Sequence, residues 1–195
     1  MAVFYRGAGV GTHWHINVNH PKMTGFIPWN PNGVSASADR IMQHVANGIT
    51  ASPYLSLTRS FAVAWGYAIF GPKGIATATN PGYVYEIELN AHDIGRGTGL
   101  ELVDPLQELA ATLPQPLVTP SYQHDGDQNL SLGIIRPGRF RSYLRTPPLQ
   151  PGGGGVSPPR VTLELKTMFH ALRDAEILAV GNIPSSAIKN FYRAS

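Results

Sequence analysis

Glycine and proline divide this chain into short apolar segments, and that division limits the folds it can adopt. The 195 residues include 21 Gly and 17 Pro, and most segments between them suit strands better than long helices. Short strands with a few interspersed helices and Gly/Pro-rich connections favour an α+β fold over a doubly wound α/β fold. A chain of this length most simply forms one domain, so we expect a single domain over residues 1–195.

The composition restricts the class of protein further. Hydrophobic residues make up 43% of the chain and aromatic residues 9%, which is typical of a globular domain rather than a disordered one. The chain has no Cys, which excludes disulfides, thiolate metal ligands and Cys nucleophiles. No apolar run approaches the length of a membrane span, and the N-terminus lacks a signal-peptide pattern. These features fit a protein of the reducing cytosol without a membrane span.

Hydrophobic periodicity and turn residues predict the main elements. We expect strands over residues 2–6, 54–58, 83–89, 129–135, 140–144 and 176–180. Helices are expected over 35–46 with Ser37 as N-cap, over 60–70 as a largely buried helix, and from an Asp104 cap to about 113. Residues 164–173 fit a helix or a strand, and irregular connections are expected over 7–32, 71–82 and 146–159.

The C-terminal run 174–184 carries a carboxylate pair directly ahead of an apolar segment. Residues i and i+2 of a strand point to the same face, so we expect Asp174 and Glu176 to project side by side. Two acids on one face repel each other and resist burial. Such a pair favours a site for a cation or for a developing positive charge, and the alternative is two solvated acids at a strand edge.

Two further segments carry chemistry that fits such a site. Arg6 follows a short apolar run and precedes Gly7. Arg offers a rigid fork of donors suited to phosphate, and Gly lets a ligand approach the backbone closely. In the predicted strand 54–58, Ser56 and Thr58 carry hydroxyls at i and i+2, just before the predicted helix.

The order of these motifs resembles the Arg-Ser-Glu group of mono-ADP-ribosyltransferases, the cholera-toxin-like branch. Arg6 in Tyr-Arg-Gly matches the family's first-strand Arg. Ser56-Leu57-Thr58 matches its Ser-Thr-Ser strand, with Leu in place of the middle Thr, and Glu176 matches its catalytic Glu. The tail Glu-Ile-Leu-Ala-Val-Gly-Asn-Ile-Pro is similar to the family's Glu-Val-x-x-x-Gly-Gly-Ile-Pro. Residues 90–160 carry none of the family's motifs.

The resemblance implies two packed antiparallel β-sheets, flanked by helices, with a central cleft for NAD. It implies an enzyme of the bacterial toxin or effector type that transfers ADP-ribose from NAD to a macromolecular acceptor, with release of nicotinamide. The acceptor would be a protein side chain or a nucleic-acid base, NAD the co-substrate, and no metal would be needed. A cognate inhibitor or immunity protein is a further partner of this type. The expected location is the cytosol of the producing or target cell, reached by a specialised secretion route.

The resemblance also assigns roles to the residues. Glu176 would accept a hydrogen bond from the ribose 2′-hydroxyl and offset the charge of an oxocarbenium-like sugar. Arg6 would clamp the diphosphate or the ribose, with Gly7 permitting close approach. Ser56 would hold Glu176 or the nicotinamide ribose in register, and Thr58 would support the strand. An aromatic ring should stack on the nicotinamide, and the candidates are Tyr67, Phe70 and Tyr54.

Asp174 departs from the family pattern. Arginine-modifying members carry Glu two residues before the catalytic Glu, and several guanine- or asparagine-modifying members carry Gln there. Asp keeps the charge but shortens the reach by one methylene, so the class of acceptor stays open. We expect Asp174 to orient a cationic guanidinium, or to act as general base for an amine, a hydroxyl or water.

Two other functions stay open on the sequence. The same fold and residues could hydrolyse NAD, with water as the acceptor. Residues 128–163 contain five Arg and no acid, which suits a phosphate-bearing partner, either NAD or nucleic acid. A non-enzymatic nucleic-acid-binding module would use the arginines of 136–160, although solvated arginines on loops and strand faces explain them without a function.

Histidines near the N-terminus form a candidate metal cluster. His13 and His15 would share one face of a strand, with His20 nearby. No clear further ligand lies close in the sequence, so structural or ligand-lining roles are preferred. The glycine-rich stretch 7–11 precedes no immediate helix pattern, which disfavours a Rossmann or P-loop site.

Overall fold

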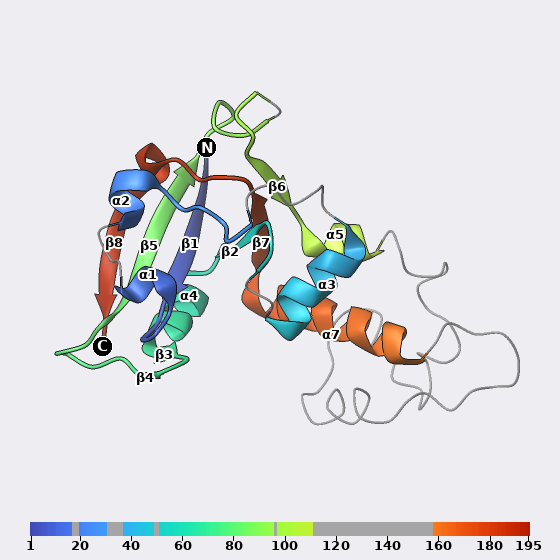
Figure 1. Ribbon diagram of the computed structural model, residues 1–195, viewed down its shortest axis with the longest axis horizontal. Helices are drawn as coiled ribbons and strands as arrows, with labels where there is room; N and C mark the ends of the chain where they lie inside the picture. The colour runs from blue at the N-terminus through green and yellow to red at the C-terminus, as the bar shows by residue number, and fades with distance from the viewer. Residues whose placement is uncertain (17–19, 31–36, 49–50, 96, 111–157) are drawn as a thin grey trace, which may run out of the picture. The chain divides into compact units, whose positions relative to one another are not determined.

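A computed structural model describes residues 1–16, 20–30, 37–48, 51–95, 97–110 and 158–195 (Figure 1). The chain divides into two compact units. The first comprises Met1–Ala36, Thr50–Asp104 and Asp174–Ser195, and the second comprises Ser37–Ile49 and Pro105–Arg173. The expectation of one domain over the whole chain stays a prediction.

The first unit is built on a six-stranded antiparallel sheet with the strand order β6-β7-β2-β1-β5-β8 (Figure 1). Its strands are β1 (Ala2–Ala8), β2 (Tyr54–Thr58), β5 (Gly82–Leu89), β6 (Glu101–Val103), β7 (Glu176–Val180) and β8 (Ile188–Ala194). A hairpin of β3 (Phe70–Gly71) and β4 (Gly74–Ile75) forms a small second sheet. This arrangement confirms the α+β class, whereas two packed sheets around an NAD cleft stay a prediction.

The large sheet consists of two three-stranded halves joined at one point. Strand β1 pairs with β5, and β2 pairs with β7, along their whole lengths. Strands β1 and β2, in contrast, pair at Tyr5 and Thr58. The backbone therefore diverges on either side of this pair, and side chains have to bridge the gap between the halves.

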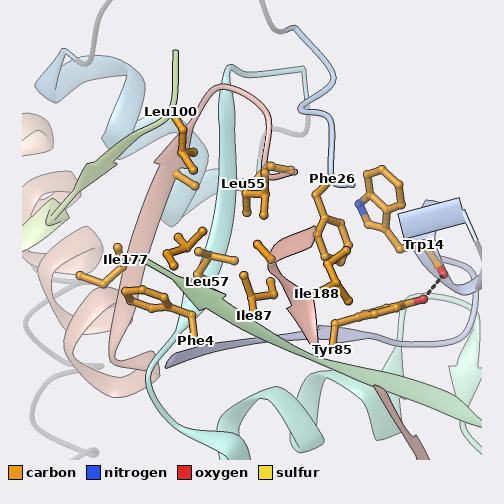
Figure 2. Close-up of a cluster of buried hydrophobic side chains, with 14 of the residues drawn as sticks. Phe4, Trp14, Phe26, Leu55, Leu57, Tyr85, Ile87, Leu100, Ile177 and Ile188 are labelled. Atoms are coloured by element: carbon orange, nitrogen blue, oxygen red, sulfur yellow. Dashed lines mark hydrogen bonds between the residues drawn. The ribbon is translucent and has the colours of Figure 1, made fainter. Parts of the chain in front are cut away.

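Alternate residues of both halves meet in one hydrophobic core (Figure 2). Segments before β2 add two aromatic rings to it, Trp14 and Phe26, which meet edge to face. The hydroxyl of Tyr85 donates a hydrogen bond to the carbonyl of Trp14 at 3.3 Å, as Figure 2 shows. The strand residues of the core include Phe4, Leu55, Leu57, Tyr85, Ile87, Ile177 and Ala179.

Helix α4 (Phe61–Ile69) covers part of the other face of the sheet, and it is less buried than the sequence predicted. Ser60 caps its N-terminus by accepting a hydrogen bond from the Val63 amide. Of its residues, Ala64 and Ala68 are buried, and they pack against the sheet. The expectation of a largely buried helix is wrong because small residues form the contact face, Trp65 and Ile69 are only partly buried, and Phe61 and Tyr67 are exposed.

Several segments expected to be irregular contain short elements. The stretch 7–32 contains α1 (His13–Ile16) and α2 (His20–Thr24), and the β3–β4 hairpin lies in the predicted loop 71–82. A 3-10 turn, η2 (Ser185–Ala187), precedes β8. The strands predicted over 129–135 and 140–144 lie outside the described residues, as does the predicted loop 146–159 except for its last two residues, which begin a helix.

The second unit contains the remaining helices, α3 (Ala38–Asn47), α5 (Pro105–Ala110) and α7 (Pro158–Asp174). The predicted Ser37 cap of α3 is confirmed, because its side chain accepts from the Arg40 amide. The α7 bounds settle residues 164–173 as helix. In the part of the chain described, no helix has the length and apolar character needed to span a bilayer.

Candidate functional site

Arg6 lies in β1 next to the junction of the two sheet halves. Its Nη1 donates a hydrogen bond to the backbone carbonyl of Ser56 on β2, with an N···O distance of 2.6 Å. The one pairing of β1 with β2 involves Tyr5, the residue before it. The guanidinium therefore spans the place where the strands diverge, and it brings the first two predicted motifs into direct contact.

The Arg6 side chain is partly buried. Its Nε is buried and has no hydrogen-bond partner among the described residues. The guanidinium carbon lies 5.7 Å from the ring centre of Phe26. Burial lowers the pKa of Arg6 to about 10, and the negative charge of Glu176 opposes this shift. A buried cation with an unused donor is costly unless an anion or acceptor joins it, so this position favours a negatively charged ligand group.

Glu176 begins β7 directly opposite Thr58 of β2, and its side chain is half-buried. Its neighbour Ile177 belongs to the core, so strand alternation directs Glu176 to the opposite face. Ser56 lies on that same face of β2. Arg6 leaves β1 on the core face, and the negative charge of Glu176 acts on its pKa electrostatically. The predicted Arg, Ser and Glu thus lie on three adjacent strands, β1, β2 and β7, with Ser56 and Glu176 on the face opposite to that of Arg6.

The expected side-by-side geometry of Asp174 and Glu176 on one strand is wrong. Asp174 is the last residue of α7, and the strand begins only at Glu176. Between them, Ala175 has a φ of 46°, in the left-handed region. Such a conformation costs a non-glycine residue about 1–2 kcal/mol. Backbone strain of this kind is concentrated at functional sites, so the turn itself is part of the candidate site.

Hydrogen bonds fix this turn to β2 and α4. The Asp174 side chain is buried, and its Oδ2 accepts from the hydroxyl of Tyr67 at 2.6 Å. The Asp174 carbonyl accepts from Oγ1 of Thr58 at 2.5 Å, and the Ala175 carbonyl accepts from the Arg59 amide at 3.2 Å. The Thr58 hydroxyl therefore holds the turn that precedes Glu176, and its expected role in an NAD site stays a prediction.

Close packing against helix α4 explains why residue 7 is a glycine. A Cβ at this position would lie 2.2 Å from the carbonyl oxygen of Ala64 and 2.8 Å from the Cβ of Tyr67. The absence of a side chain therefore lets α4 pack against β1. The expected role of Gly7 in admitting a ligand stays a prediction.

The three candidate aromatic residues have different surroundings. Tyr54 is buried in β2, whereas Phe70 is exposed at the start of the β3–β4 hairpin. Tyr67 has half of its surface exposed, and its hydroxyl is bound to Asp174. Stacking of any of them on nicotinamide stays a prediction.

Sequence reasoning missed two residues that surround Arg6. Tyr85 lies directly opposite Arg6 in the β1–β5 register, and its inward position follows from the alternation of its strand. Phe26, whose ring the guanidinium faces, lies in a stretch that was expected to be irregular. No local pattern could have placed it there, because an isolated bridge to Ile183 holds this segment against the unit.

The histidine segment does not have the strand geometry that a metal site would use. His13 and His15 lie in the short helix α1, and Nε2 of His15 lies 3.1 Å from the carbonyl oxygen of Pro81. Within the described ranges, no three His, Cys, Asp or Glu side chains gather in a way that could hold a metal ion.

The sequence matches no known protein family and no curated protein at a significant level. The candidate site comprises Arg6, whose Nε is buried, and a left-handed turn at Ala175 with a carboxylate at each end.

Proposed function

We propose that this protein is an NAD-dependent mono-ADP-ribosyltransferase. The observation that carries the proposal is the buried guanidinium of Arg6, with an unused Nε donor, within the electrostatic range of Glu176. NAD needs both charges close together, because its diphosphate is anionic while its reacting ribose becomes cationic. The resemblance of the Arg, Ser and Glu motifs to those of ADP-ribosyltransferases supports the same conclusion.

The proposed reaction breaks the bond between the nicotinamide nitrogen and the ribose carbon. The bonding electron pair goes to the nicotinamide, which leaves as a neutral molecule, and the ribose becomes oxocarbenium-like. Glu176 stabilises this transition state more than the ground state, because the sugar gains positive charge as the bond lengthens. Arg6 holds the diphosphate or the ribose, with its Nη1 already fixed on the Ser56 carbonyl.

The acceptor completes the reaction at the same ribose carbon. A nitrogen or oxygen of the acceptor forms the new bond and loses a proton. Asp174 is the group that orients this acceptor or takes its proton, since it is held at the other end of the strained turn from Glu176. With water as acceptor, the same site is an NAD glycohydrolase. A toxin or effector role, with a cognate inhibitor protein, belongs to the same proposal.

The nucleic-acid-binding alternative depends on arginines of residues 136–160, whose side chains lie outside the described part of the structure. It predicts salt-sensitive oligonucleotide binding that survives the loss of Glu176.

The experiment incubates purified protein with NAD and a cell lysate. Mass spectrometry then scans lysate proteins and nucleic acids for a mono-ADP-ribose adduct, and chromatography quantifies nicotinamide with and without the lysate. We expect an NAD-dependent adduct together with nicotinamide release. Nicotinamide release without an adduct would point to NAD hydrolysis, and neither product from folded protein would contradict the proposal.

A further inference from the structure

Tyr67 connects helix α4 to the turn that precedes Glu176. Its hydroxyl donates to Oδ2 of Asp174 at 2.6 Å, which is the short distance expected for a bond from a neutral hydroxyl to a carboxylate. The carboxylate belongs to a side chain that is only 9% exposed, whereas Tyr67 is 50% exposed. The bond therefore lies at the edge of the site, with its acceptor inside and the aromatic ring partly in solvent.

Helix α4 also holds the backbone of the same aspartate. The hydroxyl of Thr58 donates to the Asp174 carbonyl and accepts from the amide of Ser60 at 3.0 Å. Ser60 in turn is the N-cap of α4, through its bond to the Val63 amide. One helix thus fixes Asp174 twice, once through its N-terminal cap and the Thr58 hydroxyl, and once through Tyr67.

This arrangement gives the Tyr67 hydroxyl a specific effect. An aspartate carboxylate is free to rotate about its terminal bond unless a donor holds one oxygen. The bond to Oδ2 selects one orientation, while the Thr58 bond fixes the main chain from which the side chain starts. Both contacts lie on the Asp174 side of the turn, so removal of the Tyr67 hydroxyl should leave Glu176 and Arg6 in place.

We propose that Tyr67 is a positioning residue, whose hydroxyl orients the Asp174 carboxylate for the macromolecular acceptor. This proposal rests on the proposed function and replaces stacking on nicotinamide as the main role of Tyr67. A correctly oriented carboxylate favours a bulky acceptor over water, because water reaches the ribose carbon in many orientations. Tyr67 thereby affects the partition between ADP-ribose transfer and NAD hydrolysis.

The test compares Tyr67→Phe with a matched control, Tyr192→Phe. Tyr192 donates to Oε2 of Glu86, also at 2.6 Å, on an exposed part of the same unit. Each full-length variant is incubated with labelled NAD and a cell lysate, and the ratio of incorporated to free ADP-ribose is measured. We expect Tyr67→Phe to lower this ratio about tenfold, the usual effect of a lost bond to a charged group. The KM for NAD should stay unchanged, and Tyr192→Phe should keep the wild-type ratio.

A double variant shows whether Tyr67 acts through Asp174. Tyr67→Phe added to Asp174→Asn should cause no further fall in the ratio, because the positioned carboxylate is already lost. Phe keeps the half-exposed ring, so the variant should fold, and thermal unfolding checks this.

Three results would overturn the proposal. The first is a wild-type ratio in folded Tyr67→Phe, and the second is a further loss in the double variant. The third is a wild-type protein that releases no nicotinamide from NAD. Of the three results, only this one would also overturn the proposed function.

Discussion

Nη1 of Arg6 lies 2.6 Å from the backbone carbonyl oxygen of Ser56, and this bond closes the gap between the two halves of the sheet. The two residues are 50 positions apart in the chain. Arg6 is therefore both a candidate ligand-binding group and a structural link between β1 and β2. A change at this residue should affect binding and stability together.

Replacement of Arg6 by Lys should weaken NAD binding by about tenfold or more. Lys keeps the positive charge, but all of its donors lie on one nitrogen atom, so it cannot hold the Ser56 carbonyl and also offer a ligand the separated, planar donors of a guanidinium. Calorimetry in a Glu176→Gln background prevents turnover during the titration. Arg193→Lys is the matched control, because Nη2 of Arg193 also donates to a backbone carbonyl but at an exposed position. Unchanged NAD affinity in Arg6→Lys would make Arg6 a purely structural residue.

Replacement of Asp174 by Asn or Ala should separate two activities. Transfer of ADP-ribose to a macromolecule should fall strongly, whereas slow NAD hydrolysis should persist, because the carboxylate of Glu176 is untouched. A side-by-side assay measures incorporated and free ADP-ribose for the same variant. If both activities stay near wild type, Asp174 has no role in the reaction. If both fall together, the two carboxylates act as one unit in cleaving NAD.

The strained turn gives a prediction about stability. Ala175 has a φ of 46°, which Gly adopts freely and a β-branched residue adopts only at high cost. We expect Ala175→Val to lower the free energy of unfolding by about 1–2 kcal/mol relative to Ala175→Gly. Urea unfolding of both variants measures the difference. Equal stability of the two would show that residue 175 is not left-handed in solution.

Two glycines near α4 should respond in opposite ways to the same substitution. Gly7→Ala should lower the free energy of unfolding by about 1–3 kcal/mol, because the new methyl group would collide with the Ala64 carbonyl. Gly66 lies inside α4 with open space around it. Gly66→Ala should therefore raise stability by about 0.5–1 kcal/mol. A tolerated Gly7→Ala in thermal unfolding would contradict the close packing of α4 on β1.

Local patterns predicted several of the main elements, but they missed β6, β8 and the short helices α1 and α2, and they did not specify the contacts between elements. The strands 54–58 and 176–180 were predicted at their observed bounds, because compact apolar runs ended at clear turn residues. The geometry of Asp174 was missed because helix and strand patterns were ambiguous ahead of it, and α7 extends through this residue. The contact of Arg6 with Ser56 depends on which strands are neighbours, which no local pattern specifies. The bond from Tyr67 to Asp174 likewise depends on where α4 packs.

The most direct test of the account is nicotinamide release from NAD by Glu176→Gln. The substitution keeps the shape of the side chain but removes the charge that stabilises the cationic sugar. Glu101→Gln is a suitable control, because Glu101 is exposed on β6, the strand next to β7. We expect folded Glu176→Gln to lose at least about 100-fold in rate, equivalent to roughly 3 kcal/mol of transition-state stabilisation, while Glu101→Gln keeps the wild-type rate. Near-normal turnover by folded Glu176→Gln would contradict the assignment of this site.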